Sequence, residues 1–89
     1  MKSLKLIVHG RVHGVFYRQS TLKKATELNL NGTVRNCHDG TVEIIAEGKE
    51  EKIAELIKWC HHGPAQARVD QVDIHEQPLK NFTSFTISR

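Results

Sequence analysis

The chain has 89 residues, of which 38% are hydrophobic, so it fits one small domain with a modest core and leaves no room for a second domain. Thirteen lysine and arginine residues exceed ten acidic residues, and the formal net charge is +3. Because the basic residues are spread along the chain, they slightly favour small anionic ligands and indicate little about nucleic acid. We therefore expect a single domain over residues 1–89.

The first predicted element is a strand over residues 4–10, with Leu6 and Val8 on one face and Ile7 on the other. It leads into a segment that we call the glycine loop, Gly10-Arg11-Val12-His13-Gly14-Val15-Phe16-Tyr17-Arg18. Two glycines four positions apart let the backbone turn tightly and bring its N–H groups close to a ligand. A helix that begins just beyond them adds unpaired N–H donors and a positive dipole end. The segment therefore predicts an anion-binding site.

A first helix is predicted from residue 16 or 18 to residue 28, with Leu22, Ala25 and Leu28 at helical spacing. Arg18 falls in its first turn, where the planar guanidinium can bind two oxygens of a phosphate at once. The alternative is a solvated arginine at a helix start. The spacing of the glycines matches neither the Walker loop nor the dinucleotide fingerprint, so no nucleotide-binding motif is present.

A β-hairpin is predicted next, with strands over residues 33–37 and 41–48 after a turn at Asn31-Gly32. Asp39-Gly40 joins the two strands, and this dipeptide is a strong hairpin signal. In the second strand, alternate residues from 42 to 46 are apolar and share one face, while Glu43 and Glu47 lie on the other. We expect the apolar face to contact the helices.

The last third of the chain predicts a helix and two strands. Apolar residues at i, i+3, i+4 and i+7 predict an amphipathic helix over residues 50–62, which Gly63-Pro64 ends. Strands follow over residues 68–76 and 82–88, with four inward apolar side chains: Val72, Ile74, Phe85 and Ile87.

The order of elements is β, α, β, β, α, β with a terminal strand added. Short connections, a central hairpin and right-handed crossovers predict an α+β fold of the ferredoxin-like, split βαβ class. The expected sheet is rich in antiparallel pairs and carries both helices on one face.

Asn36 lies at the end of the second predicted strand. In this topology the crossover places the start of the first helix near one end of the sheet, so a polar residue leaving the second strand can reach residues 12–18. We therefore expect Arg18 and Asn36 to share a pocket. The alternative for Asn36 is hydrogen bonding within the turn that follows it.

The predicted open face of the sheet carries lysine, histidine, isoleucine and glutamate and lacks the aromatic residues of an RNA-recognition module. We therefore expect no nucleic-acid partner. The clusters Cys60-His61-His62 and Cys37-His38 lack the spacing of a tetrahedral metal site, so we expect no metal. Strand alternation places Cys37 on the face opposite Asn36 and favours packing over a nucleophilic thiol.

The glycine loop resembles the first signature of the acylphosphatases. The segments Gly32-Thr33-Val34-Arg35-Asn36 and Asp39-Gly40-Thr41-Val42-Glu43 together resemble the second. The similarity extends over essentially the whole length, including Gly63-Pro64 and the closing Phe85-Thr86-Ile87. Both signatures are long, which makes a chance match improbable.

The resemblance implies a hydrolase without metal or cofactor that cleaves the carboxyl-phosphate bond of acyl phosphates. It implies that the Asn36 side chain orients the attacking water and that a phosphate oxygen of the substrate takes the water proton. The phosphate would be bound by the Arg18 side chain and by the backbone N–H groups of His13, Gly14, Val15, Phe16, Tyr17 and Arg18.

His13 departs from the family, which usually has glutamine at that position. We expect its side chain to point away from the phosphate, with a role as general base as the alternative. A noncatalytic anion-binding domain is the rival function, because it would use the same loop and Arg18 but would have no use for Asn36.

The start of the chain predicts neither a signal peptide nor a membrane span, because residues 6–8 form its only early apolar run. Two cysteines, Cys37 and Cys60, are too few for a disulfide framework. We expect a cytoplasmic monomer with free thiols. We expect no membrane partner, and the one expected partner is a small acyl phosphate. In an oxidising compartment the two cysteines could pair, and the sequence leaves this open.

Overall fold

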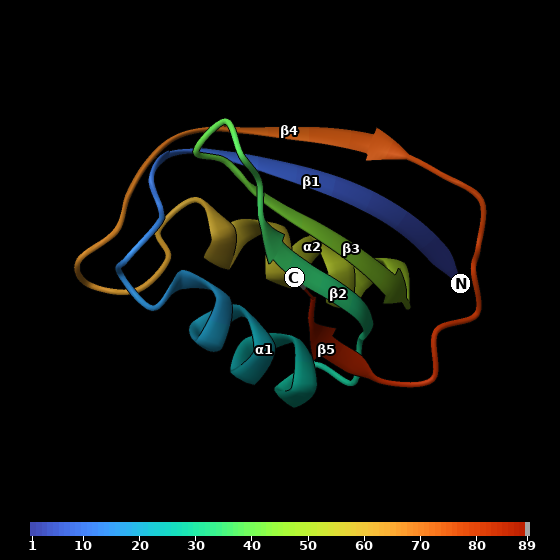
Figure 1. Cartoon of the computed structure of the whole chain (residues 1–89). Coiled ribbons are helices and arrows are strands. Elements are labelled where there is room, and N and C mark those ends of the chain that lie inside the picture. Colours follow the sequence, from blue (N-terminus) through green and yellow to red (C-terminus); the bar gives the residue numbers. More distant parts are fainter. Residues whose placement is uncertain (89) are drawn as a thin grey trace.

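The computed structural model describes residues 1–88 and has seven elements: β1 (Lys2–Arg11), α1 (Tyr17–Glu27), β2 (Asn31–Asn36), β3 (Val42–Gly48), α2 (Glu50–Cys60), β4 (Arg68–Glu76) and β5 (Phe85–Ile87). The strands form one sheet in the order β4-β1-β3-β2-β5. Its pairs are antiparallel except β2 with β5, which is parallel. The two helices pack against the sheet (Figure 1), so the predicted α+β, ferredoxin-like fold is confirmed.

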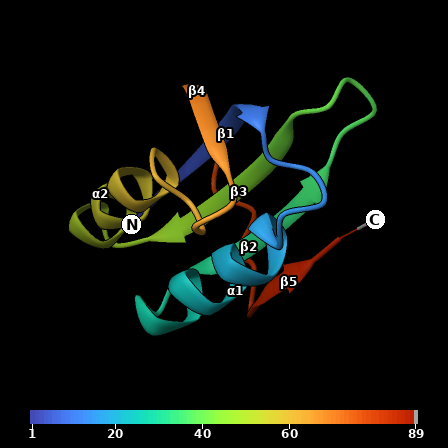
Figure 2. The same ribbon diagram turned by 90° about the vertical axis from the view of Figure 1, so that its left-hand side faces the viewer.

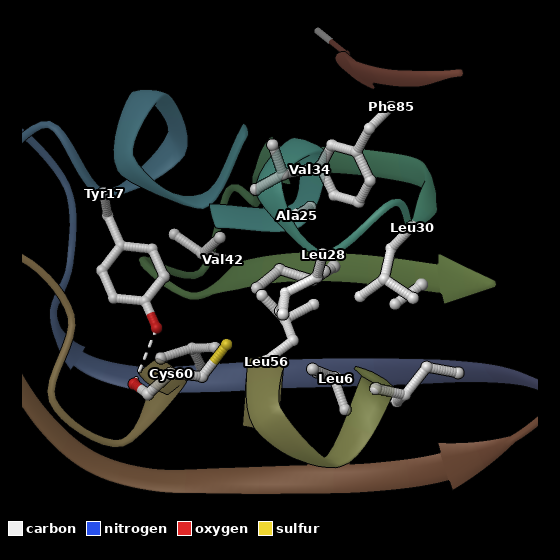
Figure 3. Packing of buried hydrophobic residues seen from close by; sticks show 14 of the residues in the cluster. Leu6, Tyr17, Ala25, Leu28, Leu30, Val34, Val42, Leu56, Cys60 and Phe85 are labelled. Carbon is white, nitrogen blue, oxygen red and sulfur yellow. Dashed lines mark hydrogen bonds between the residues drawn. The ribbon is translucent and has the colours of Figure 1, made fainter. Parts of the chain in front are cut away.

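Apolar residues from one face of the sheet and from both helices form a single core. Register pairs Leu6 with Ile44 and Val8 with Val42, and all four side chains are fully buried. The helices cover this face with Ala25 of α1 and residues of α2 that include Leu56 (Figure 3). Both helices therefore lie on the same side of the sheet, as predicted.

The first turn of α1 is tied to the C-terminal end of α2 by a buried tyrosine. Tyr17 is 1% exposed, and its hydroxyl donates a hydrogen bond of 2.8 Å to the carbonyl oxygen of Cys60 (Figure 3). Burial raises the pKa of Tyr17 well above its ordinary value, so the hydroxyl stays protonated. Sequence spacing placed Leu22 on the buried stripe of this helix, but Leu22 is half-buried, and Tyr17 and Thr21 complete the stripe instead. The burial and the hydrogen bond of Tyr17 thus hold the backbone of the neighbouring Arg18 in place.

Gly32 differs from its predicted role in a turn. The turn lies earlier, at residues 28–29, and β2 already begins at Asn31. Gly32 has a φ of +142°, and a Cβ at this position would overlap the carbonyl oxygen of Ile45. The glycine is therefore required because β3 approaches the backbone of β2 too closely for any side chain.

Three further predictions at the ends and edges of elements were wrong. Strand β5 is three residues long instead of seven, because the chain before it is held by a side chain of β3, described below. Helix α2 ends at Cys60 instead of residue 62, where the N–H groups of His62 and Gly63 both donate to the Trp59 carbonyl. Ile74, expected to be inward, is 48% exposed because β4 is an edge strand.

A buried carboxylate holds the segment that precedes β5. Glu47 is 3% exposed, and its Oε2 and Oε1 accept hydrogen bonds from the backbone N–H groups of Lys80 at 2.6 Å and Phe82 at 3.1 Å. Burial alone would raise the pKa of Glu47, but these N–H donors, together with Ser3, lower it below its ordinary value. The ionised carboxylate therefore fixes residues 80–82 to β3 and positions β5.

We expect Glu47→Gln to lower the free energy of unfolding at neutral pH by about 1–3 kcal/mol, because the variant loses charge-assisted hydrogen bonds in a buried setting. The folded pKa of Glu47 lies below the unfolded value of about 4.3. The stabilisation is therefore complete above the unfolded value and is lost as the pH falls through the folded value. Urea unfolding between neutral and acidic pH measures both effects.

The exposed Glu27→Gln variant is the matched control for this experiment. We expect it to follow the wild-type pH dependence, whereas Glu47→Gln should lose less stability on acidification. Equal stability of Glu47→Gln and wild type at neutral pH would contradict the role of Glu47.

Within residues 1–88, no helix is long and apolar enough to cross a lipid bilayer.

Candidate active site

The glycine loop leaves β1 and turns into α1 with two residues in the left-handed region. Gly14 has a φ of +71°, and Phe16, the N-cap of α1, has a φ of +64°. The helix begins as the Phe16 carbonyl accepts a hydrogen bond of 3.0 Å from the N–H of Ser20. The side chains of Val12 and Val15 are each 2% exposed and anchor the loop in the core. The loop thus has a fixed backbone path.

Gly10 has a different role from the one that sequence spacing predicts. It lies within β1, at an irregularity in the pairing with β4, and a Cβ there would overlap the carbonyl oxygen of Arg68. Gly10 is therefore needed for the approach of two strands. Gly14 provides the turn instead, and a Cβ on Gly14 would meet no other atom within 4 Å.

Consecutive backbone donors of the loop have no partner in the part of the chain that the structure describes. Within residues 1–88, no acceptor is present for the N–H groups of residues 13–19. The last of these belong to the first turn of α1, where the helix dipole is positive. Unpaired N–H groups and a helix N-terminus together form a site suited to an anion.

Arg18 and Asn36 line the same two adjoining cavities, of about 610 and 420 Å³. Arg18 lies in the first turn of α1 and Asn36 is the last residue of β2, and Figure 2 shows the end of this strand beside the loop that leads into the helix. Gln19 also lines both cavities. The structure thus brings together the two side chains that the sequence singled out.

The C-terminal strand contributes two residues that sequence reasoning missed. Ile87 and Ser88 line the larger cavity, because β5 runs parallel to β2 and the N–H of Ser88 donates to the Val34 carbonyl at 2.8 Å. No local signal in the sequence shows on which edge of the sheet this strand lies. Gln19 was also missed, although its position next to Arg18 in the first helical turn could have indicated it.

The side-chain oxygen of Asn36 is buried and has no hydrogen-bond partner within residues 1–88. Leaving such an oxygen unsatisfied costs about 1–3 kcal/mol. Hydrogen bonding within the turn after Asn36, the alternative role predicted for Asn36, is provided by Asp39. The Oδ1 of Asp39 accepts hydrogen bonds from the Thr41 N–H at 3.0 Å and the Thr41 hydroxyl at 2.6 Å. These bonds lower the pKa of Asp39. The turn therefore does not use the Asn36 oxygen, and Asn36 lines both cavities.

His13 ties the glycine loop to the hairpin that follows Asn36. Its Nε2 lies 2.8 Å from the carbonyl oxygen of Thr41. Because a carbonyl only accepts, Nε2 carries a proton and donates it to this bond. Within residues 1–88, the side chains that line the two cavities do not include that of His13. The ring thus links the two segments that carry Arg18 and Asn36.

The remaining thiols and histidines are dispersed. Cys37 is half-buried and Cys60 is buried, both as free thiols, and burial raises the pKa of Cys60 to about 12. Among residues 1–88, no three His, Cys, Asp or Glu side chains are grouped so that they could hold a metal ion.

Comparison with known proteins identifies the family. The acylphosphatase family model matches residues 4–87. An acylphosphatase of Methylococcus capsulatus is 47% identical over 100% of this chain and 98% of its own length, and one of Marinobacter nauticus is 52% identical over 90% and 88%. The solved structure of an acylphosphatase from Coxiella burnetii superimposes with a TM-score of 0.95 at 38% identity, covering 98% of this chain and 92% of that one. The chain therefore belongs to the acylphosphatase family of enzymes.

Proposed function

We propose that the chain hydrolyses the carboxyl-phosphate bond of small acyl phosphates to a carboxylate and inorganic phosphate. Family membership supports this reaction class. The observation that carries the proposal is the unpartnered, buried oxygen of Asn36 on a cavity that Arg18 also lines. A cationic side chain and an amide whose oxygen has no hydrogen-bond partner within residues 1–88 thus line one space.

In this proposal the phosphate is bound by the Arg18 guanidinium and by the backbone N–H groups of residues 13–18. The guanidinium offers a planar pair of donors, and the N–H groups lack other partners within residues 1–88. The N-terminus of α1 adds a positive dipole end. These fixed donors stabilise the negative charge of the phosphoryl group as the bond to the carboxyl oxygen breaks.

The Asn36 oxygen accepts a hydrogen bond from the attacking water and aims its oxygen at phosphorus. The water oxygen forms the new bond to phosphorus, the bond to the bridging oxygen breaks, and the carboxylate leaves with that electron pair. A phosphate oxygen of the substrate takes the water proton. A carboxylate leaves readily, so positioning and charge stabilisation suffice and no side-chain acid is needed.

The proposal is tested by incubating the purified chain with benzoyl phosphate in the presence of a chelator and following the loss of substrate. We expect saturable hydrolysis without added metal and competitive inhibition by inorganic phosphate. Binding of phosphate without turnover would contradict hydrolysis and would support the rival noncatalytic anion-binding domain.

We also expect the chain to act as a monomer with one domain over residues 1–89. Arg18 and Asn36 come from the same chain and line the same cavities, so one copy holds both groups. Sedimentation equilibrium at assay concentrations tests this, and activity that rises with a dimer fraction would contradict it.

His13 offers a further prediction for the same reaction. We expect His13→Ala to lower kcat/KM about 3–10-fold, because the variant loses the hydrogen bond that joins the glycine loop to Thr41. His13→Gln should stay within about twofold of wild type, since a glutamine amide can donate the same bond. Steady-state kinetics with benzoyl phosphate measures both variants. If His13 were instead the general base, His13→Gln would be as impaired as His13→Ala.

A further inference from the structure

Phe16 is an exposed aromatic residue held in an unfavourable backbone conformation. Its φ of +64° lies in the left-handed region, which is costly for a bulky residue. The residue is 74% exposed, whereas its neighbours Val15 and Tyr17 are 2% and 1% exposed. The two buried neighbours therefore turn Phe16 outward, and packing in the core does not explain an aromatic residue at this position.

The exposed residue borders the candidate site. Phe16 lines the cavity of about 420 Å³ together with Arg18, Gln19 and Asn36. Two other apolar residues, Val12 and Tyr17, line the same cavity but are almost fully buried. Among the described residues, Phe16 is thus the apolar residue of this cavity that remains accessible to a ligand.

An acyl phosphate bound at this site must place its acyl group beside the phosphate. The acyl carbon is separated from phosphorus by the bridging oxygen alone, so a phosphate held by Arg18 and the loop N–H groups leaves the acyl group within the same opening. Arg18 is the one charged side chain that lines the smaller cavity among residues 1–88, and it is occupied by the phosphate in the proposed function. The larger cavity is lined by polar or charged residues and by the half-buried Ile87, so it suits water better than it suits an apolar acyl group.

We propose that Phe16 forms an acyl subsite that selects acyl phosphates with aromatic or other apolar acyl groups over those with small acyl groups. The inference rests on the proposed function, because it assigns the acyl side of the same substrate. An aromatic ring gains both apolar contact and favourable ring geometry against Phe16, whereas an acetyl group is too small to gain either.

The test compares kcat/KM for benzoyl phosphate with kcat/KM for acetyl phosphate in wild type, Phe16→Asn and Phe16→Leu. Asparagine tolerates the left-handed conformation and removes the ring, and leucine keeps an apolar side chain. The ratio of the two values is the readout, since a disturbed loop backbone lowers both together. We expect this ratio to fall about 3–10-fold in Phe16→Asn, mainly through KM for benzoyl phosphate, and less in Phe16→Leu.

Leu79→Asn is the matched control, because Leu79 is a large exposed apolar residue that lines neither cavity within residues 1–88. It should leave the ratio at the wild-type value. An active wild type whose ratio is unchanged in both Phe16 variants would overturn the subsite alone. A wild type that hydrolyses neither substrate would overturn the proposed function and the subsite with it.

Discussion

Replacing Arg18 with alanine is expected to lower kcat/KM for benzoyl phosphate by about 10³-fold or more, with both phosphate binding and kcat impaired. Within residues 1–88, the guanidinium is the charged group that lines both cavities. In the proposed function it binds the phosphate and stabilises the negative charge that develops as the bridging bond breaks. Steady-state kinetics gives kcat and KM, and competition by inorganic phosphate gives the loss in binding.

Two variants make the result for Arg18 specific. Lys23→Ala removes an exposed positive charge from the same helix and should keep wild-type kinetics. Arg18→Lys keeps the charge but loses the planar pair of donors, so we expect an activity between those of wild type and Arg18→Ala. If Arg18→Ala kept a tenth of the wild-type kcat/KM, Arg18 could not be the main phosphate ligand.

The second large effect is expected for Asn36→Ala, which should lower kcat by about 10²–10³-fold while leaving inorganic phosphate binding nearly intact. The side chain is proposed to act on the water rather than on the phosphate, so the loss falls on the chemical step. The same kinetic and competition measurements separate the two effects. If Asn36→Ala kept more than half of the wild-type kcat, the role in orienting water would be wrong.

The free energy of unfolding of Asn36→Ala provides an independent check on the proposed role of Asn36. Its oxygen is buried without a partner in residues 1–88, so alanine removes an unsatisfied group rather than a hydrogen bond. We therefore expect the free energy of unfolding to stay the same or to rise slightly. A marked loss of stability would indicate that Asn36 supports the fold and would explain reduced activity without a role in the reaction.

Much of the fold could be predicted because local signals agreed with the tertiary structure. The apolar spacing of α2 and the Asp39-Gly40 turn specify their elements within a few residues of sequence, and strand β4 was predicted at its observed ends, Arg68–Glu76. Arg18 and Asn36 could be placed together because the topology alone brings the start of α1 to the end of β2.

The features that could not be predicted depend on contacts between distant segments. Glu47 looks like an outward residue of an alternating strand, and its burial depends on residues 80–82, which lie far along the chain. The bond from His13 to Thr41 likewise requires the final position of the hairpin. The side chain of Phe16 points outward because its backbone has a left-handed φ. Phenylalanine disfavours this conformation, so the backbone propensity of the residue would not predict it.

The hydrogen bond from Tyr17 to Cys60 has a consequence for how activity is lost. The ring of Tyr17 also lies against the turn after α2, where a Cβ on Gly63 would come within 2.6 Å of it. If that distant turn unfolded, Tyr17 would lose these contacts and the neighbouring Arg18 would no longer be held in place. We therefore expect inactivation by heat to coincide with global denaturation, because the first turn of α1 is held by contacts of the core.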